Sequence, residues 1–185
     1  APTLSRNEID FFTMATQADA LDFGDVASGA TYLGCGTANS TRGIIICGRD
    51  TGGQANIIEY ITISTTGNAA DFGDAVVTDN AVATGAGGNA TRGVLAGGGD
   101  SQITDITYIT YATLGNTTKF GDLHTGLGYH AAVSDRITLV TGGGGPNINR
   151  MDAVKISAGG ISTDFGDLTV SKTTMSGCSN AHGGL

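Results

Sequence analysis

The tripeptide Phe-Gly-Asp occurs four times in this chain of 185 residues, and it constrains the fold more than any other feature. The copies begin at intervals of 49, 48 and 45 residues, at Phe23, Phe72, Phe120 and Phe165. A second signal precedes each copy in the same register, at 8–14 (EIDFFTM), 59–64 (EYITIS), 107–112 (TYITYA) and 152–157 (DAVKIS). Two signals that recur together predict a tandem repeat of about 48 residues.

Each repeat predicts short β-strands separated by Gly-rich turns. The segments of the 59–64 type alternate in polarity and are rich in β-branched and aromatic residues, which favours half-buried strands over helices. A third signal, Thr-Arg-Gly before an apolar run, stands at 41–48 and 91–98, with 135–143 as its divergent counterpart. A further strand is expected after each Phe-Gly-Asp, as in 75–85. About four short strands in a unit of this length are typical of a propeller blade.

The repeat boundaries predict a single all-β domain over 1–185. Complete repeats span 26–74, 75–122 and 123–167, and half-repeats stand at 1–25 and 168–185. Joined in space, the half-repeats would form a fourth blade, close the ring and cover the exposed sheet edges. We therefore expect a β-propeller of four blades. The alternative is a cut through a longer array of repeats.

Composition excludes several classes of function. The chain has 31 glycines and no Trp, yet short apolar runs recur throughout, which favours a folded protein over the alternative of disorder. A net charge of -8 with nine Lys and Arg argues against nucleic-acid binding, and no apolar run is long enough to span a membrane. The N-terminal sequence lacks the regions of a signal peptide. Cys35, Cys47 and Cys178 fit neither a metal-ligand spacing nor a disulfide framework, so we expect mostly buried thiols.

The repeat signature resembles a known family. Its parts are the Gly-rich turn, the Tyr-Ile-Thr strand, the segments 67–74 (GNAADFGD) and 168–180 (LTVSKTTMSGCSN), and the Thr-Arg-Gly run. Together they resemble tandem kelch-like repeats in virion structural proteins of marine bacteriophages, especially cyanophages. The resemblance covers nearly the whole chain and implies a kelch-like propeller on the virion surface, in a tail fibre, an appendage or a capsid decoration. Because Trp and some Gly-Gly pairs of ordinary kelch repeats are missing, enzymes with kelch propellers are analogies of fold only.

The motif aspartates are candidates for a metal site: Asp25, Asp74, Asp122 and Asp167. Fourfold repetition would place them in a ring, where carboxylate oxygens could hold a hard cation such as Ca²⁺. The interpretation that we favour is that each Asp closes a turn by accepting backbone N–H groups after a Gly with positive φ. We therefore expect no metal and no cofactor.

Arg42, Arg92 and Arg136 are interpreted as equivalent positions of the Thr-Arg-Gly signal, with His182 at the fourth. Repeated Arg beside repeated Asp predicts a charge pair in each blade, because a guanidinium group can bind a carboxylate through two parallel hydrogen bonds. An anion site is the alternative. A structural pair predicts that Arg92→Ala destabilises the fold.

The motif phenylalanines are predicted to pack between blades, each contributing about 1.5–3 kcal/mol by burial: Phe23, Phe72, Phe120 and Phe165. Stacking platforms for sugars are the alternative. A second aromatic series, Phe11, Tyr60 and Tyr108, is interrupted by Ala153.

The chain is not expected to be an enzyme, because its three His residues are not repeated with a Ser or Cys partner and no catalytic motif is present. A structural or adhesive module that binds other virion proteins is the function we expect. Contacts between copies of this chain in a homo-oligomer are a further alternative. The alternative function is a lectin-like propeller that recognises host surface carbohydrate through polar loops and residues such as Tyr32 and Tyr129.

Overall fold

The computed structural model describes residues 6–29, 32–46, 48–50, 53–77 and 84–179. These residues form β-strands and turns without a helix, which confirms the predicted all-β class. The described part of the chain thus contains no helix long and apolar enough to cross a membrane.

The strands of each complete repeat form one antiparallel sheet in which sequence neighbours pair. We call these sheets unit 1 (26–74), unit 2 (75–122) and unit 3 (123–167). Unit 1 contains β3 (Cys35–Ala38), β4 (Arg42–Ile46), β7 (Ile57–Thr62) and β8 (Ala70–Asp74). Unit 2 contains β9 (Gly85–Gly88), β10 (Arg92–Ala96), β11 (Asp105–Thr110) and β12 (Thr118–Asp122). Unit 3 contains β13 (Ala131–Ser134), β14 (Thr138–Gly142), β15 (Arg150–Lys155) and β17 (Thr163–Asp167).

Short elements supplement these sheets. β5 (Arg49–Asp50) pairs with β6 (Gly53–Gln54) beside unit 1. β16 (Gly160–Ile161) belongs in sequence to unit 3, yet it pairs in parallel with β12 of unit 2.

An Asn or Asp side chain fixes the turn between the first two strands of each unit. The Asn39 side chain accepts hydrogen bonds from the backbone N–H groups of Thr41 and Arg42. Asn89 and Asp135 accept the equivalent pairs of bonds in units 2 and 3. Because such a side chain replaces a backbone acceptor, this residue sets the register of the hairpin.

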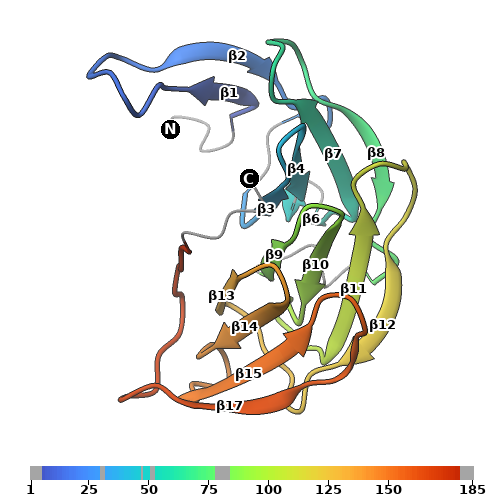
Figure 1. Ribbon diagram of the computed structural model, residues 1–185, viewed down its shortest axis with the longest axis vertical. Helices are drawn as coiled ribbons and strands as arrows, with labels where there is room; N and C mark the ends of the chain where they lie inside the picture. The colour runs from blue at the N-terminus through green and yellow to red at the C-terminus, as the bar shows by residue number, and fades with distance from the viewer. Residues whose placement is uncertain (1–5, 30–31, 47, 51–52, 78–83, 180–185) are drawn as a thin grey trace.

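Units 1 to 3 stand side by side in an arc, with β3, β9 and β13 on the inner side and β8, β12 and β17 on the outer side (Figure 1). The apolar core lies between neighbouring units. One cluster joins Ile44 and Phe72 of unit 1 to Leu95 and Tyr111 of unit 2. A second cluster joins units 2 and 3 in the same way. Burial between sheets therefore holds the units together.

The chain ends do not form the expected fourth blade in the described residues. β1 (Glu8–Phe11) and β2 (Leu21–Asp25) form a separate two-stranded sheet, which we call the hairpin. The described part of the C-terminal half-repeat, 168–179, contains no strand, and 180–185 lie outside the described residues. This segment instead packs along unit 3, where Thr174 donates its N–H to the Tyr129 carbonyl at 2.7 Å. A closed ring is therefore not seen, because nothing described connects the hairpin to β17.

Candidate functional site

The Phe-Gly-Asp strand of the hairpin is bound by a turn of unit 1. The Gly67 N–H donates to the Phe23 carbonyl oxygen at 2.7 Å, and the Ala69 N–H donates to the Asp25 carbonyl oxygen at 2.8 Å. In return, the Asp25 N–H donates to the Asn68 side-chain oxygen at 3.1 Å. We call this set of hydrogen bonds the clasp.

The clasp recurs between units 1 and 2 with the same atoms. Gly115 donates its N–H to the Phe72 carbonyl at 2.7 Å, and Thr117 donates to the Asp74 carbonyl at 2.9 Å. The Asp74 N–H donates to the Asn116 side-chain oxygen at 3.0 Å. Each of these two Phe-Gly-Asp strands therefore binds the Gly-Asn turn of the next unit along the chain.

Between units 2 and 3 the clasp takes the form of a short parallel sheet. Gly121 pairs with Gly160, and Ile161 stands where the other units have Asn. The Ser162 N–H still donates to the Asp122 carbonyl at 2.9 Å. The backbone hydrogen bond between these units is thus retained, although Ile161 replaces the Asn whose side chain supports the other two clasps.

The middle residue of the tripeptide must be Gly where a clasp forms. Gly24 and Gly73 have φ of +149° and +142°, which side chains with a Cβ rarely adopt. A Cβ on Gly24 would lie 2.4 Å from the Gly67 oxygen, and one on Gly73 would lie 2.5 Å from the Gly115 carbonyl carbon. The turn of the next unit therefore occupies the space that a side chain would need.

The motif phenylalanines differ in burial according to whether a further unit packs on them. Phe23 and Phe72 are 8% and 2% exposed, whereas Phe165 is 59% exposed. Phe120 is half-buried and packs on the cluster between units 2 and 3. Within each sheet the rings of Phe23, Phe72 and Phe120 also meet those of Phe11, Tyr60 and Tyr108, edge to face. Packing between units is thus seen for Phe72 and Phe120, and Phe165 lacks it.

Arg42 and Arg92 do not pair with the motif aspartates, which corrects one prediction. Arg42 donates from Nη1 to the Tyr111 carbonyl of unit 2, and its guanidinium lies 4.8 Å from the centroid of the Tyr60 ring. Arg92 donates to the Ser157 carbonyl of unit 3 at 3.0 Å and lies 4.5 Å from the centroid of the Tyr108 ring. Both cations therefore connect one unit to the next through its carbonyl groups, and each also packs on a ring face of its own unit.

Arg136 is not equivalent to Arg42 and Arg92, which corrects a second prediction. Arg42 pairs with Thr62 and Arg92 with Thr110, whereas the residue at that register position in unit 3 is Thr138, opposite Lys155. Arg136 lies two residues earlier, in the turn that Asp135 fixes. His182, expected at the fourth position, lies outside the described residues.

The motif aspartates end β2, β8, β12 and β17, which belong to four different sheets, and they do not meet in the ring considered as an alternative: Asp25, Asp74, Asp122 and Asp167. The described residues contain no cluster of three or more His, Cys, Asp or Glu suited to a metal ion. Asp122 instead forms an ion pair with Lys119 at 2.9 Å within its own strand. The favoured turn interpretation is also incomplete, because Asp25 and Asp74 contribute backbone groups to the clasp.

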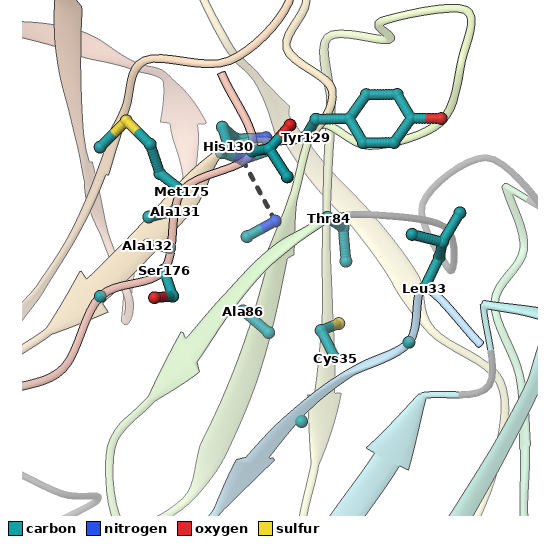
Figure 2. Close-up of a pocket in the computed structure, with 15 residues that line it drawn as sticks. Leu33, Cys35, Thr84, Ala86, Tyr129, His130, Ala131, Ala132, Met175 and Ser176 are labelled. Atoms are coloured by element: carbon teal, nitrogen blue, oxygen red, sulfur yellow. Dashed lines mark hydrogen bonds between the residues drawn. The ribbon is translucent and has the colours of Figure 1, made fainter. Parts of the chain in front are cut away.

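A pocket of about 310 Å³ opens where the inner strands of the three units meet (Figure 2). Its walls are the starts of β3, β9 and β13 and the C-terminal segment 174–177. Its lining is mostly apolar and includes Cys35, Met175 and the imidazole of His130. We call it the inner pocket.

His130 is the titratable group buried at the inner pocket. Its Nε2 accepts a hydrogen bond from the Gly85 N–H at 3.2 Å, so the proton of the neutral ring is on Nδ1. No acceptor among the described residues forms a hydrogen bond with Nδ1. Burial lowers the pKa of His130 to about 4, although the nearby Ala96 carbonyl opposes this shift. His130 therefore contributes a buried, neutral imidazole to the wall of the pocket.

Three polar side chains beside this pocket, one from each unit, are joined by hydrogen bonds. The Asp100 carboxylate of unit 2 accepts hydrogen bonds from the Tyr129 hydroxyl of unit 3 and from the Arg49 guanidinium of unit 1. The hydrogen bond from Tyr129 lowers the pKa of Asp100, and the Arg49 charge lowers it further. Because the Tyr129 hydroxyl is bound to Asp100, it is less suited to the sugar contact that the lectin hypothesis assigned to it.

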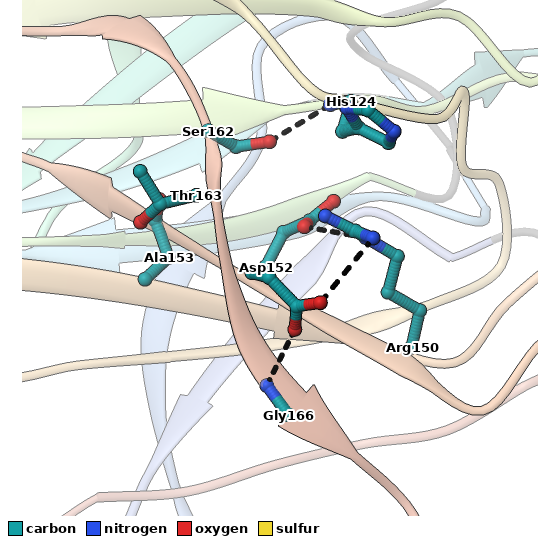
Figure 3. A network of polar contacts seen from close by, with 8 residues as sticks. His124, Arg150, Asp152, Ala153, Ser162, Thr163 and Gly166 are labelled. Carbon is teal, nitrogen blue, oxygen red and sulfur yellow. Dashed lines mark hydrogen bonds and ion pairs between the residues drawn. The ribbon is translucent and has the colours of Figure 1, made fainter.

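A second polar network holds the fourth Phe-Gly-Asp strand in place (Figure 3). Arg150 binds the buried Asp152 carboxylate at 2.8 Å and the Asp164 carboxylate at 3.5 Å. Asp164 in turn accepts a hydrogen bond from the Gly166 N–H at 2.9 Å. These side chains fix the local geometry of β17 from within unit 3.

The sequence did not reveal the inner pocket, because His130 has no repeated counterpart. Cys35 lines this pocket and is half-buried, whereas Cys178 is exposed, contrary to the expectation of buried thiols. Cys47 lies outside the described residues. The Gly-Asn dipeptides at 67–68 and 115–116 could have indicated the clasp, because they precede Phe-Gly-Asp at the same distance.

The chain was also compared with known proteins. No model of a known protein family matches the sequence, and no curated protein matches it significantly. The contacts between units and the inner pocket are therefore the features from which a function can be argued.

Proposed function

We propose that the chain is a non-catalytic structural module that makes protein–protein contacts. One observation carries this proposal: the residues that recur from unit to unit form the contacts between units. The clasp uses the recurring Phe, Gly and Asp positions together with the Gly-Asn turn. Arg42 and Arg92 also bind carbonyl groups of the next unit. Repetition in this chain thus serves assembly of β-units.

We infer that the units are kelch-like propeller blades. The sequential antiparallel order and the arc with the first strand innermost support this (Figure 1). Each blade depends on its neighbour for burial, as in other repeat proteins. A body built in this way is rigid and can present its loops to partners.

The setting that we propose is the surface of a phage virion, as part of a tail fibre, an appendage or a capsid decoration. This part of the proposal rests on the resemblance of the repeat signature to kelch-like repeats of marine bacteriophages. The expected partners are other virion proteins.

A lectin-like function is the second candidate, because the inner pocket is a cavity of about 310 Å³ with the His130 ring among its lining residues. A glycan array probed with the purified protein separates the two functions. The structural function predicts no saturable binding. Saturable binding that is lost in His130→Phe, with the fold retained by circular dichroism, would replace it with the lectin.

Rigidity is tested separately by limited proteolysis. We expect cleavage to leave one resistant fragment that contains units 1 to 3, because two apolar clusters connect them. Rapid cleavage between β8 and β9 into separate units would contradict a rigid module.

A further inference from the structure

The fourth Phe-Gly-Asp strand has no clasp partner in the described part of the chain. Phe165 is exposed, and a Cβ on Gly166 would find only the Met151 Cε atom, at 3.8 Å. Among the described residues, no turn donates to the Phe165 or Asp167 carbonyl groups in the way that Gly67 and Ala69 donate to the hairpin.

This strand nevertheless has the geometry of the two Phe-Gly-Asp strands that bind a Gly-Asn turn. Gly166 has φ of +134°, close to the values of Gly24 and Gly73. The pairing of β15 with β17 shifts register between Met151 and Asp152, as unit 1 does at the equivalent place. Since the network around Arg150 holds this geometry, docking would order little additional backbone. The site is preformed for a turn of the clasp type.

The hairpin at the other end of the chain has a turn at the equivalent place in its sequence. Its Thr16 N–H donates to the Thr13 carbonyl at 3.1 Å, which repeats the bonds from Thr65 to Thr62 and from Thr113 to Thr110 at the same distance. Counting back from the tripeptide places Ala18, Asp19 and Ala20 where unit 1 has its clasp residues 67–69. Ala18 lacks the positive φ that Gly67 has at this position, so docking would require a change of backbone there. The Asp19 carboxylate can accept an N–H as the Asn68 amide oxygen does.

The hairpin also exposes a residue that units 2 and 3 bury against the preceding unit, whereas Ile63 at this position of unit 1 is 45% exposed. This position holds Tyr111 in unit 2 and Ile156 in unit 3, which are 1% and 0% exposed. In the hairpin it holds Met14, which is 92% exposed. The hairpin therefore presents an apolar side chain with no unit to cover it.

We propose that the hairpin of one chain docks on unit 3 of a second copy of the same chain. Residues 18–20 would form the clasp with the Phe165, Gly166 and Asp167 strand, and Met14 would pack on unit 3. This inference rests on the proposed function and names its partner. Within the described residues the hairpin and β17 lie at opposite ends of the arc, so this hairpin does not reach this strand (Figure 1). The contact is head-to-tail, so it leaves one free site at each end and can continue.

Sedimentation of the purified full chain over a range of concentrations tests this proposal. We expect the wild type to form dimers and larger species as concentration rises. Met14→Asp and Phe165→Asp are both expected to be monomeric, because each places a charge in the contact. Val76→Asp, at another exposed apolar residue, is the matched control and should associate as the wild type does. Circular dichroism checks that all variants fold.

Mixing the two defective variants tests the head-to-tail arrangement. Met14→Asp keeps an intact unit 3, and Phe165→Asp keeps an intact hairpin, so the mixture should form a heterodimer that grows no further. A wild-type monomer at every soluble concentration overturns the proposal, whether the arc stays open or closes on itself. A mixture that stays monomeric overturns it as well. A monomer without glycan binding would contradict only this contact, whereas saturable glycan binding would contradict the proposed function.

Discussion

The Asn68 side-chain oxygen accepts a hydrogen bond from the Asp25 backbone N–H at 3.1 Å, and so joins the hairpin to unit 1 across 43 residues of sequence. Asn116 and Asp74 make the same contact between two complete units. The two hydrogen bonds are alike in chemistry. The first attaches the hairpin, a half-unit at the end of the arc, whereas the second joins two complete units.

Asn68→Ala should therefore loosen the hairpin without unfolding the units. Loss of this hydrogen bond removes about 1 kcal/mol of stabilisation. Hydrogen exchange should show faster exchange in 8–25 and little change in unit 2.

Asn116→Ala is the comparison, because its contact holds units 1 and 2 together. We expect it to lower the melting temperature of the whole protein more than Asn68→Ala does. Equal effects on melting would show that the hairpin is an integral part of the cooperative unit, contrary to this prediction.

The tripeptide glycines should respond to Ala according to whether a clasp is occupied. Gly73→Ala combines an unfavourable φ with a backbone contact at 2.5 Å, so we expect a loss of about 3 kcal/mol or more. Gly166→Ala has a similar φ but an open space around the new methyl group. It should cost about 1–2 kcal/mol. Chemical denaturation of both variants at low protein concentration measures the difference, and equal losses would argue against steric closure by the turn of unit 2.

The strands were predictable from the sequence because they depend on local patterns. The Phe-Gly-Asp, Thr-Arg-Gly and Tyr-Ile-Thr signals each mark a strand in the structure. The order within a unit follows from the short Gly-rich connections, which favour antiparallel neighbours.

The partners of the recurring side chains were harder to predict, because they belong to other units. Arg92 was expected beside an aspartate, but it binds the Ser157 carbonyl. The error at Arg136 arose from aligning a shared residue type, whereas the turn residue Asp135 sets the register. Closure of the ring depends on the angle between packed sheets, which no local pattern of residues encodes.

Arg92→Ala should destabilise the protein, for a reason that differs from a charge pair. The substitution removes charged hydrogen bonds to the carbonyl groups of Ile156 and Ser157 and the contact with the Tyr108 ring. We expect a loss of about 1–3 kcal/mol, measured by urea denaturation. Arg92→Lys should recover part of this loss, because it keeps the charge but not the planar group.

Arg136→Ala is the matched control, because this side chain is exposed in a turn. Substitutions at exposed surface positions usually change stability by less than about 0.5 kcal/mol. If Arg136→Ala lowered the stability as much as Arg92→Ala does, Arg136 and Arg92 would be equivalent positions, contrary to the strand register.

His130 should make the stability of the fold depend on pH. Its pKa is about 4 in the folded protein and 6.5 as the ordinary value, so the unfolded chain binds the proton more tightly. Stability from this group is thus fully present above pH 6.5 and is lost as the pH falls toward 4. A shift of this size corresponds to about 3 kcal/mol.

His130→Gln should flatten this pH dependence, because the Gln side-chain oxygen can accept the Gly85 N–H without titrating in this range. His124→Gln is the matched control, since His124 is exposed and the variant keeps His130. Denaturation at a series of pH values between 4 and 6.5 should give a steep decline in stability for the wild type and His124→Gln, and a shallower one for His130→Gln. Carboxylates titrate near the lower limit in all three proteins, so the difference between the two His variants isolates the imidazole. The same slope in both variants would mean that His130 is already protonated, or open to water, in the folded protein.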